Sequence, residues 1–149
     1  MSRIQNIFKS LKEKNEKALI PFFTAGDPHP DVTVNLMNAL VDSGADMIEL
    51  GIPFSDPMAD GPVIQRASER ALQNNVGITA TIKLAAEFRK LNKDTPLILM
   101  GYANPIEAIG VDNFINLIKE ADIDGVITVD YPPEESKNFV NKLKKNGID

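Results

Sequence analysis

Short apolar runs alternate with segments of helical period along the whole chain, and this alternation constrains the fold more than any other feature. Runs of this length suit strands of a buried sheet, and a helix-length segment separates each from the next. The strands are predicted at 18–24, 45–50, 97–100 and 125–129. Because consecutive strands are joined through helices, the sheet is predicted to be parallel, with the helices packed outside it.

Helices are predicted before the first strand and after each strand. Ser2 can cap the first helix, whose apolar positions fall on one helical face. The others are predicted at about 31–41, at 63–72, from a cap at Thr79 to Leu91, at 111–118, and from Glu134 and Glu135 toward Lys145. Ile148 and Asp149 resemble the start of a further strand.

The polar residues at the strand ends favour a barrel over a doubly wound sheet. The first strand–helix turn, TAGDPHP, lacks the G-x-G-x-x-G fingerprint of dinucleotide-binding folds. Thr24, Glu49, Tyr102 and Asp130 fall at or near the carboxyl ends of successive strands, where (β/α) barrels place their active sites. The predicted fold is α/β, of the (β/α)8 TIM-barrel family.

A complete barrel takes eight strand–helix units and about 250 residues. The chain has 149 residues, so it is expected to cover the amino-terminal helix and the first four units. Residues 1–149 are interpreted as a single unit, the amino-terminal portion of a barrel domain that stops before the fifth strand.

Composition excludes several classes of function. The net charge of −5 argues against nonspecific nucleic-acid binding, which needs clustered Lys and Arg. With no cysteine and only His29, a zinc site has too few ligands, and no metal site is predicted. No run approaches the ~20 apolar residues of a membrane span, and the amino terminus does not resemble a secretory signal. A cytoplasmic location is therefore expected.

A pair of carboxylates in one run, ELGIPFSDPMADGP at 49–62, is the strongest candidate for chemistry. Two acids in different surroundings can perform acid and base catalysis near neutral pH. Structural interpretations remain open for both. Glu49 could be a buried acid paired with an arginine, and Asp60, just before Gly61 and Pro62, could cap a helix. Phe22 and Tyr102 could likewise be packing residues.

Four segments resemble the α subunit of tryptophan synthase, in that family's order: ALIPFFTAGDP, ADMIELGIPFSDPMADGPVIQRAS, LMGYANPI and DGVITVDYPPEE. The resemblance implies a lyase of tryptophan biosynthesis that cleaves indole-3-glycerol phosphate to indole and glyceraldehyde 3-phosphate by a retro-aldol reaction. It implies no cofactor in this chain. Pyridoxal phosphate is expected only in a partner β subunit, within an α2β2 heterotetramer.

The resemblance also assigns roles to particular residues. The catalytic acids correspond to Glu49 and Asp60, and the walls of the indole pocket to Phe22 and Tyr102. The surface facing the β subunit corresponds to Pro53, Phe54, Asp56, Asn104 and Pro132. The family's phosphate clamp and mobile lid follow later strands, so the isolated chain is expected to be inactive.

Two other functions stay open. The chain could be a non-catalytic half-barrel that docks on a β subunit, or part of another phosphate-binding TIM-barrel lyase or isomerase.

Overall fold

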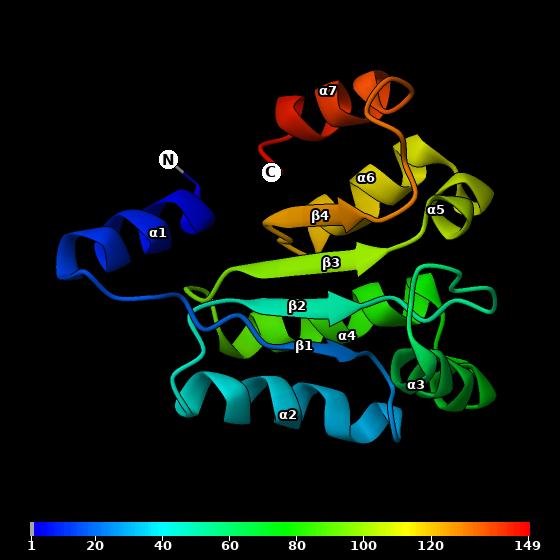
Figure 1. Cartoon of the computed structure of the whole chain (residues 1–149), viewed down its shortest axis with the longest axis horizontal. Helices are drawn as coiled ribbons and strands as arrows, with labels where there is room; N and C mark the ends of the chain where they lie inside the picture. The colour runs from blue at the N-terminus through cyan, green and yellow to red at the C-terminus, as the bar shows by residue number, and fades with distance from the viewer. Residues whose placement is uncertain (1) are drawn as a thin grey trace.

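The computed structural model describes residues 2–149 and contains one four-stranded parallel sheet with the strand order β1-β2-β3-β4. Figure 1 shows the four strands side by side, with their carboxyl ends at the same edge of the sheet. This confirms the predicted parallel α/β architecture. The strands are β1 (Phe22–Thr24), β2 (Ile48–Gly51), β3 (Leu97–Gly101) and β4 (Gly125–Thr128).

Helices separate the strands, as the alternation of the sequence predicts. They are α1 (Arg3–Lys14), α2 (Pro30–Asp42), α3 (Pro62–Gln73), α4 (Ile78–Leu91), α5 (Ala103–Ile109), α6 (Val111–Glu120) and α7 (Lys137–Lys145). Along the sheet α2 packs on α4, α4 on α6 and α6 on α7. None of the helices described within residues 2–149 is both long enough and apolar enough to span a membrane.

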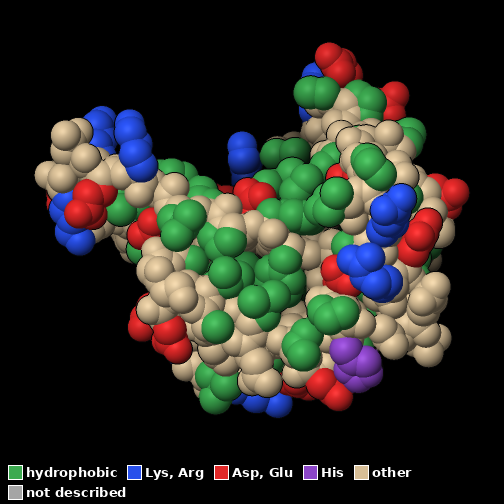
Figure 2. Space-filling model, turned by 60° about the horizontal axis from the view of Figure 1, so that its bottom comes forward, with side chains coloured by type: hydrophobic (Ala, Val, Ile, Leu, Met, Phe, Trp, Pro, Cys, Tyr) green, Lys and Arg blue, Asp and Glu red, His purple; other side chains and the backbone are tan. Residues whose placement is uncertain are grey.

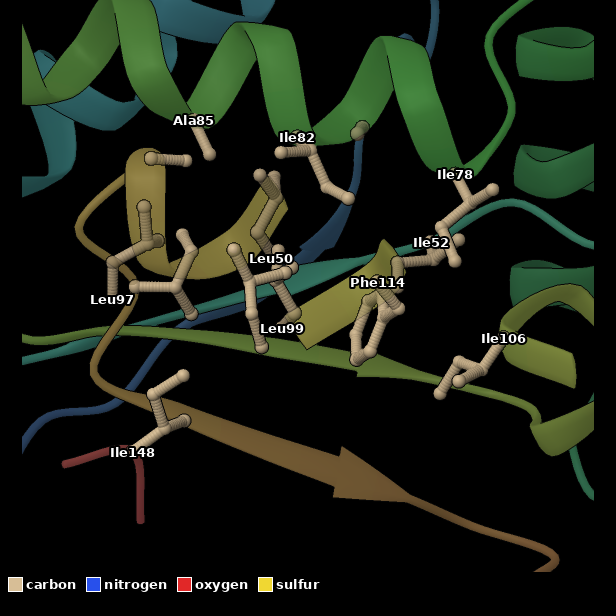
Figure 3. Close-up of a cluster of buried hydrophobic side chains, with 14 of the residues drawn as sticks. Leu50, Ile52, Ile78, Ile82, Ala85, Leu97, Leu99, Ile106, Phe114 and Ile148 are labelled. Atoms are coloured by element: carbon tan, nitrogen blue, oxygen red, sulfur yellow. The ribbon is translucent and has the colours of Figure 1, made fainter. Parts of the chain in front are cut away.

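The hydrophobic core lies between the sheet and these helices. Leu50, Leu97 and Leu99 are fully buried and belong to one cluster with Ile82 and Ala85 of α4. Figure 3 shows these side chains between the helix and the strands. Burial of a leucine of this kind stabilises the fold by about 1.5–3 kcal/mol.

The other face of the sheet is less covered. Because side chains alternate between the two faces of a strand, the neighbours of the core leucines point away from the helices. Glu49, Ile98 and Met100 are only partly buried, and Ile127 of β4 is 38% exposed. In a (β/α) barrel this face is the interior.

Two helix starts differ from the prediction. α4 begins at Ile78 with Gly77 as its N-cap, so Thr79 lies inside the first turn and caps nothing. α7 begins at Lys137, and Glu134 and Glu135 occupy a preceding turn. In that turn the N–H groups of Glu135 and Ser136 both donate to the Pro132 carbonyl, which delays the regular helix.

The first strand is shorter than predicted, and one helix was not predicted. Residues 18–21 approach β2 through isolated bonds, such as Glu49 N–H to the Pro21 carbonyl at 3.0 Å, and β1 begins only at Phe22. The short helix α5 contains Pro105. Proline usually interrupts a helix, but it is tolerated in the first turn, where Pro105 lies.

Asp149 continues the pattern of the sheet along β4. Its carbonyl accepts a hydrogen bond from Val126 N–H at 3.0 Å, and its N–H donates to the Asp124 carbonyl at 2.9 Å. These contacts agree with the prediction that Ile148 and Asp149 resemble the start of a strand.

A network of charges joins α1 to the amino end of the sheet. The Arg3 guanidinium contacts Asp122 at 2.6 Å and Asp124 at 2.8 Å, while the buried Arg89 also pairs with Asp124. Burial lowers the pKa of Arg89, and the charge of Asp124 acts in the opposite direction. Every charged group in this cluster pairs with a group of opposite charge, so no charge is left unpaired at the amino end of the sheet.

Asp122→Asn is expected to weaken the dependence of stability on acid pH. Burial acts to raise the pKa of Asp122, but its hydrogen bond with Arg3 and the nearby positive charges outweigh burial and lower the pKa. A carboxyl with a lowered folded pKa stabilises the fold above its unfolded pKa of about 4, and this contribution is lost as pH falls through the folded pKa.

The substitution should cost on the order of 1 kcal/mol at pH 7, discounted because the Asp122 side chain is 45% exposed. Urea unfolding of a complete barrel containing this segment, measured between pH 7 and about pH 2, would check it. Asp112→Asn, which removes a surface pair with Lys142, is the control and should cost at most about 0.5 kcal/mol. If the free energy of unfolding of Asp122→Asn fell with acid pH as steeply as that of the native protein, the lowered pKa of Asp122 would be contradicted.

Candidate active site

A hollow lies at the carboxyl ends of the strands. These strand ends point to the right in Figure 1. All four strands or the residues just after them contribute to the hollow, together with the loop after β2 and the first turns of α3. Its lining consists of Phe22, Thr24, Gly51, Ile52, Asp60, Ile64, Ser68, Met100, Gly101, Tyr102 and Val129. Three of the four residues predicted for catalysis and substrate binding therefore come together here.

Asp60 is held in the hollow by Tyr102. The Tyr102 hydroxyl donates to Asp60 Oδ2 at 2.9 Å and accepts from Ala59 N–H at 3.0 Å. Burial and the bond to Asp60 raise the pKa of Tyr102, so the phenol stays protonated and can donate. The Asp60 carboxylate therefore has a fixed hydrogen-bond donor, and this bond sets its orientation in the hollow.

The alternative in which Asp60 caps α3 is wrong. The N-cap residue of α3 is Gly61, and within residues 2–149 no side-chain hydrogen bond caps the amino end of that helix. Asp60 instead uses its side chain toward Tyr102, while its main-chain carbonyl accepts from Gln65 Nε2 at 2.9 Å. The loop is therefore tied to the helix through its backbone, which leaves the carboxylate in the hollow.

Glu49 lies on the inner face of the sheet, below the hollow. Its neighbours Ile48 and Leu50 are fully buried on the helix side, so alternation places Glu49 on the same face as Gly51. Gly51 lines the hollow and Glu49 does not; two residues of strand separate them by roughly 7 Å. Within residues 2–149 no Lys or Arg forms an ion pair with Glu49, so the structural pairing with arginine has no partner there.

Phe22 forms a wall of the hollow because Gly51 leaves it room. The two residues lie on adjacent strands, where Phe22 pairs with Glu49 and Thr24 with Gly51. A Cβ atom at position 51 would lie 2.8 Å from Phe22 Cζ, closer than carbon atoms approach. Gly51 is therefore needed for the Phe22 ring to pack where it forms the wall of the hollow.

Most residues predicted to face a partner lie on the surface at this end of the sheet. Asp56, Asn104 and Pro132 are exposed and Phe54 is partly exposed, whereas Pro53 is buried. The ring of Phe54 packs against Tyr102 with 5.4 Å between the centroids. Through Phe54, the loop after β2 is thus in direct contact with Tyr102, the residue that holds Asp60.

Two supporting residues complete the rim. Asp130 accepts a hydrogen bond from Ala103 N–H at 2.7 Å and so joins the end of β4 to the start of α5. His29, expected to be an exposed turn residue, is exposed (purple in Figure 2) and its Nδ1 also accepts from Asp31 N–H as the N-cap of α2. Asp130 lies at the rim as its position after β4 predicts, whereas the capping role of His29 was not predicted.

The parallel strand–helix units and the site at their carboxyl ends define the class of the protein: the first part of a (β/α)8 barrel. A sequence profile described as tryptophan synthase alpha chain matches residues 8–149. The chain belongs to this family.

Individual relatives agree with this assignment. The tryptophan synthase alpha chain of Cupriavidus pinatubonensis is 60% identical over all of this chain and 56% of its own length. The crystal structure of the alpha subunit from Legionella pneumophila is 51% identical with a TM-score of 0.97, over 99% of this chain and 56% of that one. A chain from the Pyrococcus furiosus tryptophan synthase α2β2 complex gives 44% identity and a TM-score of 0.82, over 88% and 52%. The chain therefore spans about half the length of the relatives it matches.

Proposed function

We propose that the complete protein containing this chain is a lyase that cleaves indole-3-glycerol phosphate to indole and glyceraldehyde 3-phosphate. One observation supports this most: the Asp60 carboxylate is fixed by Tyr102 in a hollow on the sheet face that also carries Glu49. The biosynthetic role of the family, in making tryptophan, is part of the proposal, as is a cytoplasmic location.

The reaction needs a place for the electron pair of the broken carbon–carbon bond. Many aldolases supply it with a lysine Schiff base, but no lysine lines the hollow within residues 2–149. The indole ring of the substrate can serve instead. Protonation of the ring carbon that bears the side chain gives a cation, and this cation accepts the electron pair when the side chain departs.

Glu49 and Asp60 fit the two roles that this scheme requires. Protonated Glu49 delivers a proton to the ring carbon, and its carboxylate then takes the proton of the hydroxyl that becomes the aldehyde, so the acid is regenerated. Asp60 remains anionic and accepts a hydrogen bond from the ring N–H as positive charge develops there. Phe22 and Tyr102 provide walls for the flat ring.

The proposal includes a partner and excludes a cofactor in this chain. Phe54, Asp56, Asn104 and Pro132 follow three successive strands and lie at the end of the sheet where the hollow opens. We infer that they face a β subunit, which would carry pyridoxal phosphate in an α2β2 assembly. The Pyrococcus furiosus relative belongs to a tryptophan synthase α2β2 complex, which supports that stoichiometry.

The isolated 149-residue segment is expected to release no indole, whereas the complete chain should do so. Barrels usually bind phosphate with the loops after strands seven and eight, which this segment does not contain. β1 and β4 are the outer strands of the sheet in the part of the chain that the structure describes, and Ile127 on the inner face is 38% exposed. The unpaired strand edges and the exposed apolar face should both promote self-association.

Indole release by the segment and by the complete chain, with the molecular mass of each from light scattering, would check this expectation. Robust turnover by a monomer of 149 residues would contradict it. If the complete chain binds a β subunit but never releases indole, the non-catalytic docking function replaces the lyase. Loss of turnover after dialysis against a chelator would instead favour a metal-dependent aldolase.

A further inference from the structure

The hydroxyl of Thr24 is a buried polar group that the fold leaves without a partner. Thr24 is the last residue of β1 and is 4% exposed, and its Oγ1 makes no hydrogen bond within residues 2–149. Leaving such a group unsatisfied costs about 1–3 kcal/mol. Other buried threonines are satisfied: Thr33 accepts from Gly26 N–H and Thr81 donates to the Gly77 carbonyl, both at 3.0 Å.

Strand geometry explains why Thr24 lacks a partner and where its side chain lies. Alternation puts Thr24 on the same sheet face as Phe22, and the register pairs it with Gly51, which has no side chain to cover it. The side chain lines the hollow together with Asp60 and Ser68. The orphaned hydroxyl therefore belongs to the candidate active site rather than to the helix-side core.

The hollow has room for a water beside its polar side chains. A volume of about 20 Å³ within it is accessible to the centre of a water molecule, and a single water needs about 10–15 Å³ by this measure and two to four polar partners. Thr24 and Ser68 offer hydroxyl groups, and Asp60 offers a carboxylate. The bond from Tyr102 goes to Oδ2 of Asp60, so Oδ1 is the oxygen at which a second donor adds most to the orientation of the group.

We propose that a water bridges Thr24 Oγ1 and Asp60 Oδ1, which makes Thr24 a positioning residue for Asp60. This inference rests on the proposed role of Asp60 as the anionic acceptor of the ring N–H. With Tyr102 on one oxygen and the water on the other, the plane of the carboxylate is fixed. A carboxylate accepts about four hydrogen bonds, so lone pairs remain for the substrate.

The test compares the complete native chain with Thr24→Val and Thr24→Ser. Valine keeps the branched shape and removes the hydroxyl, whereas serine keeps the hydroxyl and removes a methyl group. Thr81→Val in α4, which lies in the helical layer, is the matched control. We expect crystal structures of the native chain and Thr24→Ser to hold a water within about 3.2 Å of residue 24 Oγ and Asp60 Oδ1, and Thr24→Val to lack it.

In solution, Thr24→Val is expected to lower kcat about tenfold with KM within about twofold, which corresponds to the loss of one hydrogen bond to a charged group. Thr24→Ser should recover most of kcat. The melting temperature should not fall in Thr24→Val, because the substitution removes a buried polar group that has no protein partner. Thr81→Val should keep native kcat while losing stability, since it breaks a bond to the Gly77 carbonyl.

Three results would overturn the inference: no bridging water in the native crystal, native kcat in Thr24→Val, or an equal loss of kcat in Thr24→Ser. The last would assign the effect to shape rather than to the hydroxyl. Failure of the proposed function has a different signature, because the native complete chain would then release no indole even with the water in place.

Discussion

Replacing Glu49 by glutamine in the complete chain is expected to lower kcat for indole release at least about a thousandfold. General acid–base catalysis contributes roughly 10²–10⁴ in rate, and Glu49 is assigned both the protonation of the ring carbon and the deprotonation of the hydroxyl. Glutamine keeps the size of the side chain but can do neither. The measurement is initial-rate indole formation from indole-3-glycerol phosphate.

Two controls separate chemistry from folding. Glu87→Gln makes the same change at an exposed position of α4 and should leave kcat within about twofold of native. Circular dichroism and melting temperature should be close to native in Glu49→Gln, because Glu49 makes no ion pair with a Lys or Arg of residues 2–149. Substantial turnover by a folded Glu49→Gln protein would refute the assigned role.

Asp60→Asn is expected to lower kcat by about a hundredfold. The amide can still accept a bond from the Tyr102 hydroxyl, so the loop should keep its position, but the negative charge beside the ring nitrogen is lost. Removing one preorganised electrostatic partner of a transition state costs about 10²–10³ in rate.

Asp112→Asn is the matched control for this substitution, since Asp112 pairs with Lys142 on the surface away from the hollow. Tyr102→Phe provides an intermediate case that keeps the charge and removes its fixed donor. The expected order of kcat is native, then Tyr102→Phe, then Asp60→Asn. Equal rates for Asp60→Asn and the native chain would remove Asp60 from the mechanism.

Much of the fold could be predicted because local pattern and tertiary role agree. The buried leucines of β2 and β3 lie on apolar runs, and the alternation of runs and helices requires a parallel sheet. A helix boundary was misplaced where two nearby residues could both serve as the N-cap, as at the start of α4. Thr79 is a good capping residue, yet Gly77 reaches the extended N-cap conformation one residue before the helix begins.

What the sequence could not reveal depends on partners far apart in the chain. The charge network brings Arg3 to Asp122 and Asp124 across more than a hundred positions, and no periodicity encodes that contact. The bond between Tyr102 and Asp60 is of the same kind, so the sequence alone left Asp60 as either a cap or an acid. The Thr24 hydroxyl became a candidate only when its surroundings were known.

The most direct test is a crystal structure of the complete chain with a non-cleavable indole phosphate analogue. The indole ring should lie between the two acids, its N–H within about 3.2 Å of an Asp60 carboxylate oxygen and its reactive carbon facing the Glu49 carboxyl group. An indole ring seated with either acid out of reach, in a complex that otherwise holds the phosphate correctly, would contradict the two-carboxylate mechanism.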